Sequence, residues 1–191
     1  RKTTIAVETN KIDKDAVNLL RQIVRLLRNE GVNVEFLMQP AHPLFYAQSR
    51  DNQDKYGYVK VEKFLKLMAA SHPEKAEFLT DQQHVIFFKS LVPATLERGW
   101  LQLAFLVAND TPISAYLNFD YNDHILVYNS GLDPEGYGHL SPGIVLLAYC
   151  IEHAIELGRE VFDFLRGDEQ YKYRMGGKDT AVKQIIAQVQ K

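Results

Sequence analysis

The chain has 191 residues, of which 46% are hydrophobic and 11% aromatic, so it is long enough to bury the core of one globular domain. Its formal net charge of −2 excludes a general attraction to nucleic acid or to an anionic membrane, and its single cysteine, Cys150, excludes an intrachain disulfide. It contains no run of about 20 apolar residues and no signal-peptide core at its start, so we expect a cytoplasmic protein without a membrane span.

The first part of the chain, residues 1–57, predicts a segment of extended and helical structure. Ile5–Val7 predicts a short strand, and Lys14–Glu30 predicts a helix with one apolar side. Val34–Met38 predicts another strand, and residues 39–57 predict a long loop because they contain two prolines and show weak periodicity. One interpretation is that this segment is the remnant of a preceding domain.

The second part, residues 58–191, opens with two predicted helices and then changes to the period of a sheet. Val61–Ala70 has helical spacing, and Thr80 followed three residues later by Gln83 is a capping-box pattern that predicts a helix as far as Arg98. Three predicted strands follow, joined by short turn sequences: Trp100–Ala108, Ile113–Tyr121 and His124–Ser130. These strands predict an antiparallel meander.

A strand–helix–strand crossover is predicted after the meander. Ser141 before Pro142 places a capping residue ahead of a proline at the first helical position, and an apolar face continues until Gly158. Glu160–Leu165 predicts a strand parallel to the last meander strand, and Ala181–Val189 predicts a final strand. The predicted fold class is α/β of the α+β kind, with a mixed, mostly antiparallel sheet, one parallel β-α-β crossover and flanking helices.

The start of the crossover helix is a candidate anion site. Unpaired N–H groups and the positive end of the helix dipole point outward there, and a glycine-containing loop, Pro134–Leu140, leads into it. Against this, Pro142 lacks an N–H group and Glu135 adds a negative charge. The alternative is a helix start that serves folding only, and the sequence leaves both interpretations open.

The most unusual stretch is 161–177, VFDFLRGDEQYKYRMGG, in which a buried strand changes within a few residues into an ionic, aromatic corner. Ligands of related sheets gather outside the carboxyl ends of the strands, where this corner is expected to lie. The alternative is structural. Asp168 and Lys172 have the i,i+4 spacing of a surface ion pair, and Asp163 has Arg166 as a nearby partner.

Two motifs of this part resemble a known superfamily. They are YNSGLDPEGYGHLSPGIVLL, which begins at Tyr128, and FDFLRGDEQYKYRMGG, which ends at Gly177. With the predicted strand order they resemble the GNAT acyltransferases, and more narrowly the bacterial-type branch of cellulose-biosynthesis-associated acetyltransferases, which is related to the FemAB aminoacyl transferases. The resemblance covers about residues 58–188 and implies a GNAT-like acyltransferase domain over 58–191.

The resemblance implies an enzyme that moves an acetyl or aminoacyl group to an amine of a sugar, peptide or small metabolite by direct attack in a ternary complex. The implied donor is acetyl-CoA or another acyl-CoA, with aminoacyl-tRNA as the alternative. The donor is expected at the helix start, on Gly138, His139, Leu140, Ser141, Gly143 and Ile144. The general acid is expected to be Tyr171, and the base Glu169 or Asp168.

Substrate-binding groups are expected on both sides of the same space. The candidates, which include positive side chains for a phosphate or carboxylate, are Asn129, Ser130, Arg166, Lys172 and Arg174. Structural alternatives stay open, since Asn129 and Ser130 also fit the end of a strand and Tyr171 also fits a core position. The prediction on which the others depend is that Ser130, Ser141 and Tyr171 face one cavity.

Two classes of function remain, the acyltransferase and a non-catalytic GNAT-fold module for binding or assembly. The FemAB resemblance also implies pairing with a second GNAT-like domain or with a second copy. Nucleic acid is expected only as an aminoacyl-tRNA donor, because the basic stripe Arg21, Arg25 and Arg28 is most simply a solvated helix face. No metal site is predicted, since His42 has no second ligand at metal spacing.

Overall fold

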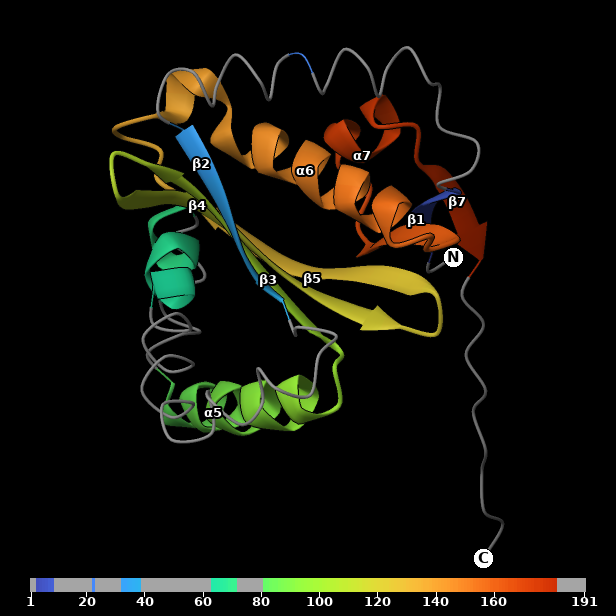
Figure 1. Ribbon diagram of the computed structural model, residues 1–191, viewed down its shortest axis with the longest axis horizontal. Helices are drawn as coiled ribbons and strands as arrows, with labels where there is room; N and C mark the ends of the chain where they lie inside the picture. Colours follow the sequence, from blue (N-terminus) through green and yellow to red (C-terminus); the bar gives the residue numbers. More distant parts are fainter. Residues whose placement is uncertain (1–2, 9–21, 23–31, 39–62, 72–80, 182–191) are drawn as a thin grey trace, which may run out of the picture.

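The computed structural model of the protein describes residues 3–8, 22, 32–38, 63–71 and 81–181 (Figure 1). In this part of the chain seven strands form one sheet in the order β2-β3-β4-β5-β6-β1-β7. β5 and β6 pair in parallel, and the other described neighbours pair antiparallel. The predicted mixed, mostly antiparallel sheet with one parallel crossover and flanking helices is confirmed.

The central meander consists of β3 (Leu101–Ala108), β4 (Thr111–Tyr121) and β5 (His124–Leu132). Two-residue turns of Asn and Asp join these strands, and all four turn residues have the left-handed φ that tight hairpin turns need. β3 is buried along its whole length, because helices cover both faces of the sheet at this strand. All three strands lie where the sequence predicted them.

The crossover runs from β5 through α6 (Pro142–Glu156) to β6 (Val161–Arg166). β5 pairs with β6 over three positions, His124 to Leu126. Beyond these positions β5 continues to Leu132 beside β4, whereas β6 continues beside β1 on its other edge. The two parallel strands therefore separate in the middle of the sheet, and the start of α6 faces the point of separation.

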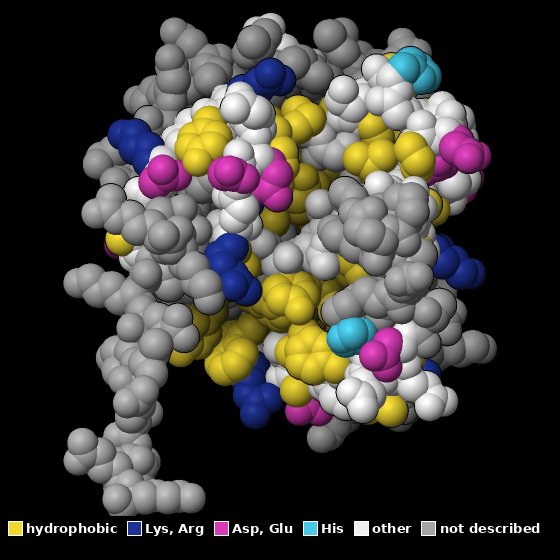
Figure 2. All heavy atoms as spheres, turned by 180° about the vertical axis from the view of Figure 1, so that it is seen from behind, with side chains coloured by type: hydrophobic (Ala, Val, Ile, Leu, Met, Phe, Trp, Pro, Cys, Tyr) yellow, Lys and Arg dark blue, Asp and Glu magenta, His cyan; other side chains and the backbone are white. Residues whose placement is uncertain are grey.

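Helices lie on both faces of the sheet (Figure 1). α6 packs on one face in a core shared with β3, β4, β5 and β6. The other face is covered by the helical residues 63–71, which confirm part of the helix predicted at Val61–Ala70, and by α5 (Gln82–Glu97). Ile86 and Phe87 of α5 stay exposed, and Figure 2 shows hydrophobic side chains at the surface among charged ones.

The N-terminal segment contributes two strands to the same sheet. β1 (Thr3–Glu8) lies between β6 and β7 and pairs antiparallel with both. β2 (Val32–Met38) pairs with β3 at the opposite end of the sheet. Both strands lie where the sequence predicted short strands, but their places in the sheet depend on pairing with residues more than 60 positions away in the chain.

Two helix starts differ from the prediction. The N-cap of α5 is Asp81, whose Oδ1 accepts a hydrogen bond of 2.9 Å from the N–H of Gln83, whereas Thr80 lies outside the described residues. Ser141 does precede α6, but it has the left-handed conformation, with φ 51° and ψ 51°, and its side chain makes no capping hydrogen bond. Ser141 therefore supplies no side-chain cap to this helix.

Three predicted segments lie wholly or largely outside the described residues. These are the helix at Lys14–Glu30, of which Gln22 alone is described and is helical, the loop at 39–57, and most of the strand at Ala181–Val189. The observed strand β7 (Lys178–Ala181) ends where the prediction began. Its residues are exposed and mostly polar, so no apolar alternation marked it as a strand.

Candidate active site

A cavity of about 350 Å³ lies at the end of the described sheet where β5 has left β6. It is lined by β4, by the end of β5, by the start of α6, by the first residues of α7 (Gln170–Arg174) and by the end of the helix at 63–71. Ser130, Ser141 and Tyr171 all line it, as the sequence predicted. The helix start and the corner after β6 therefore face a common space.

The polar groups on the cavity wall are hydroxyls. Six lining side chains carry one: Ser71, Ser114, Tyr116, Ser130, Ser141 and Tyr171. Among the described residues no carboxylate, imidazole, ammonium or guanidinium group lines this space. Because a hydroxyl both donates and accepts hydrogen bonds, such a wall suits neutral polar groups and a carbonyl that develops negative charge.

Two tyrosines bring their hydroxyls to this wall, and both stay neutral. Burial, and then the negative charge of Glu169, raises the pKa of Tyr171 to about 12. Burial also raises the pKa of Tyr116 well above its usual value, with the neighbouring Tyr171 acting in the same direction and the Ser130 hydroxyl opposing it. Each tyrosine is therefore a hydrogen-bond donor at neutral pH rather than an anion.

The β4 side of the cavity was not predicted. Ser114, Tyr116 and Asn118 alternate along β4 on the face covered by α6, where an apolar stripe is usual. The Ser114 hydroxyl donates to the backbone oxygen of Gly131 at 3.2 Å, and Nδ2 of Asn118 donates to Oε1 of Gln102 at 2.7 Å. The polar alternation Ser-x-Tyr-x-Asn in a strand buried on both faces was the signal that could have found it.

Cys150 of α6 lies over this stripe and is fully buried. Burial raises the pKa of its thiol to about 12, and a hydrogen bond with Asn118 opposes the rise only in part. A thiol in this state carries almost no nucleophilic thiolate near neutral pH. Cys150 is therefore a core residue.

The end of the helix at 63–71 forms a second unpredicted wall. A Cβ atom added at Gly131 would lie 2.6 Å from Cα of Met68 and closer still to its backbone nitrogen. The absence of a side chain at Gly131 thus lets β5 touch the helix backbone directly. This contact brings Ser71, whose hydroxyl donates to the backbone oxygen of Met68 at 3.1 Å, to the cavity.

The start of α6 offers fewer free N–H groups than the sequence suggested. Pro142 has none, and the N–H groups of Ile144 and Val145 both donate to the backbone oxygen of Ser141, at 3.0 and 3.2 Å. Within the described part of the chain no group accepts from the N–H of Gly143. Gly143 is thus the one open amide of the first helical turn, and it lines the cavity.

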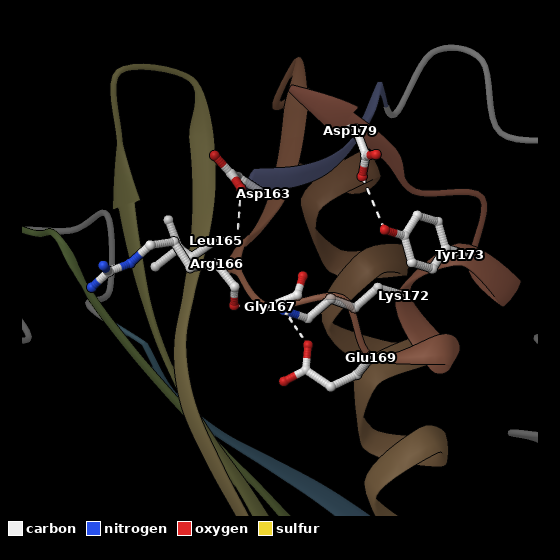
Figure 3. Close-up of polar contacts among 8 residues, drawn as sticks. All are labelled: Asp163, Leu165, Arg166, Gly167, Glu169, Lys172, Tyr173 and Asp179. Atoms are coloured by element: carbon white, nitrogen blue, oxygen red, sulfur yellow. Dashed lines mark hydrogen bonds and ion pairs between the residues drawn. The ribbon is translucent and has the colours of Figure 1, made fainter. Parts of the chain in front are cut away.

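The corner after β6 is held together by a buried lysine (Figure 3). Nζ of Lys172, which is 3% exposed, donates to the backbone oxygen of Arg166 at 2.9 Å and lies 2.8 Å from Oε2 of Glu169. The predicted pair of Lys172 with Asp168 is therefore wrong, since α7 begins only at Gln170 and Asp168 precedes the helix. Lys172 thus contacts other residues of the corner, Arg166 and Glu169, and does not line the cavity.

A strained residue lies just before this corner. Leu165 has a φ of 56°, and the register between β1 and β6 shifts there. Oδ1 of Asp163 accepts a 2.7 Å hydrogen bond from the N–H of Leu165, so this carboxylate supports the bulge and does not pair with Arg166 (Figure 3). Burial raises the pKa of Asp163, and the Leu165 N–H opposes that rise.

The predicted site residues divide into two groups. Those that line the cavity are Ser130, Gly138, Ser141, Gly143, Ile144 and Tyr171. Those that do not line it are Asn129, His139, Leu140, Arg166, Asp168, Glu169, Lys172 and Arg174. Asn129 is adjacent, and its Oδ1 accepts a hydrogen bond of 3.0 Å from the N–H of Ser130. The structure therefore brings together the helix start, the end of β5 and Tyr171, and leaves all of the charged candidates outside the cavity wall.

In the part of the chain that the structure describes, no helix is long and apolar enough to cross a membrane. Within the same residues no group of three or more His, Cys, Asp or Glu side chains is placed to hold a metal ion.

Solved structures of low sequence identity are similar to this chain, and three of them follow. For the C-terminal domain of a protein described as a lysylphosphatidylglycerol synthetase from Agrobacterium fabrum, the identity is 11% and the TM-score 0.58, over 93% of this chain and 57% of that one. FemX is 12% identical, with a TM-score of 0.59 over 93% of this chain and 59% of that one. A functionally unknown protein from Staphylococcus epidermidis is 14% identical, with a TM-score of 0.53 over 94% of this chain and 57% of that one.

These similarities show the fold, and the chain spans less than two thirds of the length of these solved structures. No curated protein matches the sequence. A family model described as "Acetyltransferase (GNAT) domain" matches residues 16–173, which is most of the chain. The resemblance seen in the two motifs is thus confirmed, and the chain belongs to the GNAT acetyltransferase domain family.

Proposed function

We propose that the protein is an N-acyltransferase that moves an acetyl or aminoacyl group from an activated donor to an amine of a sugar, peptide or small metabolite. The observation that carries the proposal is the cavity at the separation of β5 and β6, with the open Gly143 amide on one side and the Tyr171 hydroxyl on the other. Family membership supports the class of reaction. We further propose a cytoplasmic location and a bacterial type of enzyme.

The reaction needs no covalent enzyme intermediate. The amine nitrogen attacks the acyl carbon, a C–N bond forms, and the C–S or C–O bond to the carrier breaks. The amine loses one proton in this step and the leaving group gains one, so the balance is neutral. Holding both substrates in one cavity supplies much of the acceleration, because it replaces a bimolecular encounter by a positioned one.

Tyr171 is the proposed general acid. Its hydroxyl is protonated at neutral pH, since its pKa is raised to about 12. Toward a thiolate, whose pKa is about 8.5 in a free cysteine, it acts mainly as a hydrogen-bond donor to the departing sulfur. Toward the more basic alkoxide of an ester donor it can transfer the proton outright.

The acceptor amine must reach the cavity in its neutral form. Glu169 or Asp168 would take its proton through water, because both carboxylates lie outside the cavity wall and Asp168 is exposed. Oε2 of Glu169 is also 2.8 Å from the Lys172 ammonium, so this ion pair holds the carboxylate at the corner. The exposed guanidinium groups of Arg166 and Arg174 lie beside the same corner and would attract an anionic part of either substrate.

We propose an acyl-CoA as the first candidate for the donor, because residues at the start of α6 suit its pyrophosphate. A pyrophosphate would bind the Gly143 amide at the positive end of α6, with the 138–140 turn beside it. Gly138 leaves room there, since a Cβ at this position would meet no atom within 4 Å. The single open amide makes this a smaller phosphate cradle than a full helix start, so an aminoacyl-tRNA, suggested by the FemAB resemblance, is the alternative donor.

The test is acyl transfer by the purified protein. Acetyl-CoA, longer acyl-CoAs and aminoacyl-tRNAs are supplied with amino sugars, peptides and small amines, and transfer is detected by carrier release and by the mass of the product. For any active pair we expect Tyr171→Phe to lower turnover roughly 100-fold, the usual contribution of a general acid. Tyr173→Phe, which removes an exposed hydroxyl outside the cavity wall, is the matched control and should keep full activity.

A non-catalytic binding module is the second candidate, and one observation favours it. The described cavity wall carries no carboxylate or imidazole that could serve directly as a base. Such a module would bind an acyl carrier without transferring its acyl group. Saturable donor binding with no transfer to any acceptor, and equal binding by wild type and Tyr171→Phe, would support it. In either case we propose pairing with a second GNAT-like domain or a second copy.

A further inference from the structure

A second hollow lies at the other end of the β4–β5 hairpin. Its volume is about 380 Å³, and its side chains come mainly from Trp100, Asp120, Tyr121, Asn122, Asp123 and Arg159. None of these residues lines the candidate active site, which takes Ser114 and Ser130 from the opposite ends of the same strands. The volume lies in the range of about 300–1,000 Å³ that is usual for small-molecule sites.

Two aromatic rings form a corner at this hollow. The ring centroids of Trp100 and Tyr121 are 5.0 Å apart, with an angle of 77° between the planes. Tyr121 is 53% exposed and Trp100 is 37% exposed, so parts of both aromatic side chains are in contact with solvent. The guanidinium carbon of Arg98 lies 5.5 Å from the centroid of Trp100 and helps to hold this ring in place.

Fixed polar groups lie next to the rings. Arg159 contacts both carboxylate oxygens of Asp120 at 2.8 Å, and its Nη1 lies 3.5 Å from Oδ1 of Asp123. The backbone is fixed as well, since the oxygen of Asp123 accepts from the N–H of Glu160 at 2.9 Å. The carboxylates keep lone pairs beyond those that Arg159 uses, so they can still accept from a ligand.

The hollow carries charges of both signs. Among its lining side chains Asp120 and Asp123 are negative and Arg159 is positive, and Arg98, which does not line the hollow, adds a positive charge beside Trp100. An ionic ligand of either sign meets both attraction and repulsion on such a surface, whereas a neutral ligand with many hydroxyl groups finds donors and acceptors at fixed positions. The exposed parts of the two rings favour a ligand that also has an apolar face.

A pyranose ring combines these properties, because its axial C–H groups form an apolar face and its hydroxyls lie around the rim. We propose that this hollow binds a neutral sugar unit of an oligosaccharide, separately from the acyl-transfer cavity. The ion pairs of Arg159 also hold the β4–β5 turn to the end of α6, but that role does not require two neighbouring rings to stay exposed.

The single tryptophan of the chain makes the proposal directly testable, because all tryptophan fluorescence comes from Trp100. The full chain is titrated with cellotetraose, maltotetraose and N-acetylchitotetraose, and a saturable change is expected with at least one of them. Tyr121→Ala should weaken that binding at least about tenfold. Tyr173→Ala, which removes an exposed ring of α7, is the matched control and should bind as wild type does.

Several outcomes would overturn the proposal. These are no saturable change with any of the three sugars, unchanged affinity in Tyr121→Ala, and tighter binding of tetragalacturonate or tetralysine than of the neutral sugars. Self-association that Tyr121→Ala abolishes in sedimentation velocity would instead identify a protein interface. Thermal unfolding checks the fold, and Tyr121→Leu replaces Tyr121→Ala if the smaller residue unfolds the chain. No acyl transfer is measured, so failure here leaves the proposed enzyme activity standing.

Discussion

Tyr171 should make the stability of the protein fall in alkaline solution. Its pKa rises from an ordinary value of 10.0 to about 12 on folding, chiefly through burial. The stabilisation is therefore complete below a pH of about 10 and is lost as the pH rises toward about 12, because the unfolded chain releases this proton first. We expect the difference in unfolding free energy between wild type and Tyr171→Phe to move against wild type between about pH 10 and 12.

Urea unfolding at several pH values measures this difference. Tyr116 and Tyr173 also have raised pKa values. Tyr173 is present in both proteins and cancels in the comparison, whereas Tyr116 loses the part of its shift that Tyr171 causes, which is smaller than the part caused by burial. A difference that stays constant with pH would show that the Tyr171 hydroxyl titrates normally and is in contact with water. In that case the neutral, protonated acid of the proposed mechanism would lose its physical basis.

Lys172 should be a stabilising residue despite its charge. Its buried ammonium group satisfies the backbone oxygen of Arg166 and pairs with Glu169, so Lys172→Met leaves a buried acceptor without a donor. We expect this substitution to lower the unfolding free energy by about 1–3 kcal/mol in urea. Glu169→Gln is the matched control. It should cost under about 1 kcal/mol, because the Glu169 side chain is 55% exposed.

The corner after β6 could be predicted from the sequence. A glycine followed by a run of charged and aromatic residues, directly after an apolar strand, is a pattern of neighbouring residues. The partner of Lys172 was mistaken because the i,i+4 rule holds only inside a helix, and α7 starts two residues after Asp168. Burial of the ammonium group depends on the path of β6 and its bulge at Leu165, which no local pattern encodes.

At the scale of elements, the contact between β5 and the helix at 63–71 should be sensitive to one methyl group. Gly131→Ala would place a Cβ 2.6 Å from Cα of Met68, so strand and helix must move apart. We expect a loss of about 1–3 kcal/mol or more in the unfolding free energy, as for other overpacked cores. Gly138→Ala is the control, since its Cβ would meet no atom within 4 Å and its stability should change little.

The same substitution should act on the cavity, because the helix that it would displace ends at Ser71, which lines the cavity. Thermal unfolding and donor binding are therefore measured together. If Gly131→Ala is as stable as wild type, the close approach of strand and helix is wrong, and Ser71 has no fixed place on the cavity wall.

Strands and helices of regular pattern were predicted well, and the exceptions have physical causes. The meander and α6 show clear alternation or helical spacing, and short Asn-Asp turns delimit two of the strands. β7 was not predicted, because an exposed edge strand needs no apolar residues. The polar alternation of Ser114, Tyr116 and Asn118 was overlooked because a strand in the middle of a sheet is expected to be apolar on both faces.

At the scale of the whole molecule, the cavity depends on how the two ends of the sheet are completed. β6 leaves β5 after Asp163 and continues to pair with β1, so β1 satisfies the backbone groups of β6 along the separated part. Local sequence patterns predict that β1 is a strand but not that it lies between β6 and β7, because pairing over such a distance leaves no local signature. The separation that opens the site is therefore a property of the whole sheet.

The division of the chain at residue 57 stays a prediction. Because β1 and β2 belong to the same sheet as the later strands, a truncated chain can test it. A truncated chain of residues 58–191 would lack β1 and β2, so β6 and β7 would lose the strand between them and β3 would become an open edge. We expect the truncated chain to lose cooperative urea unfolding and to self-associate through its open edges, as judged by circular dichroism and size-exclusion chromatography. Addition of a separate peptide of residues 1–57 should restore part of the transition. A truncated chain that unfolds cooperatively as a monomer would instead establish 58–191 as an independent domain and make β1 dispensable for the separation of β5 and β6.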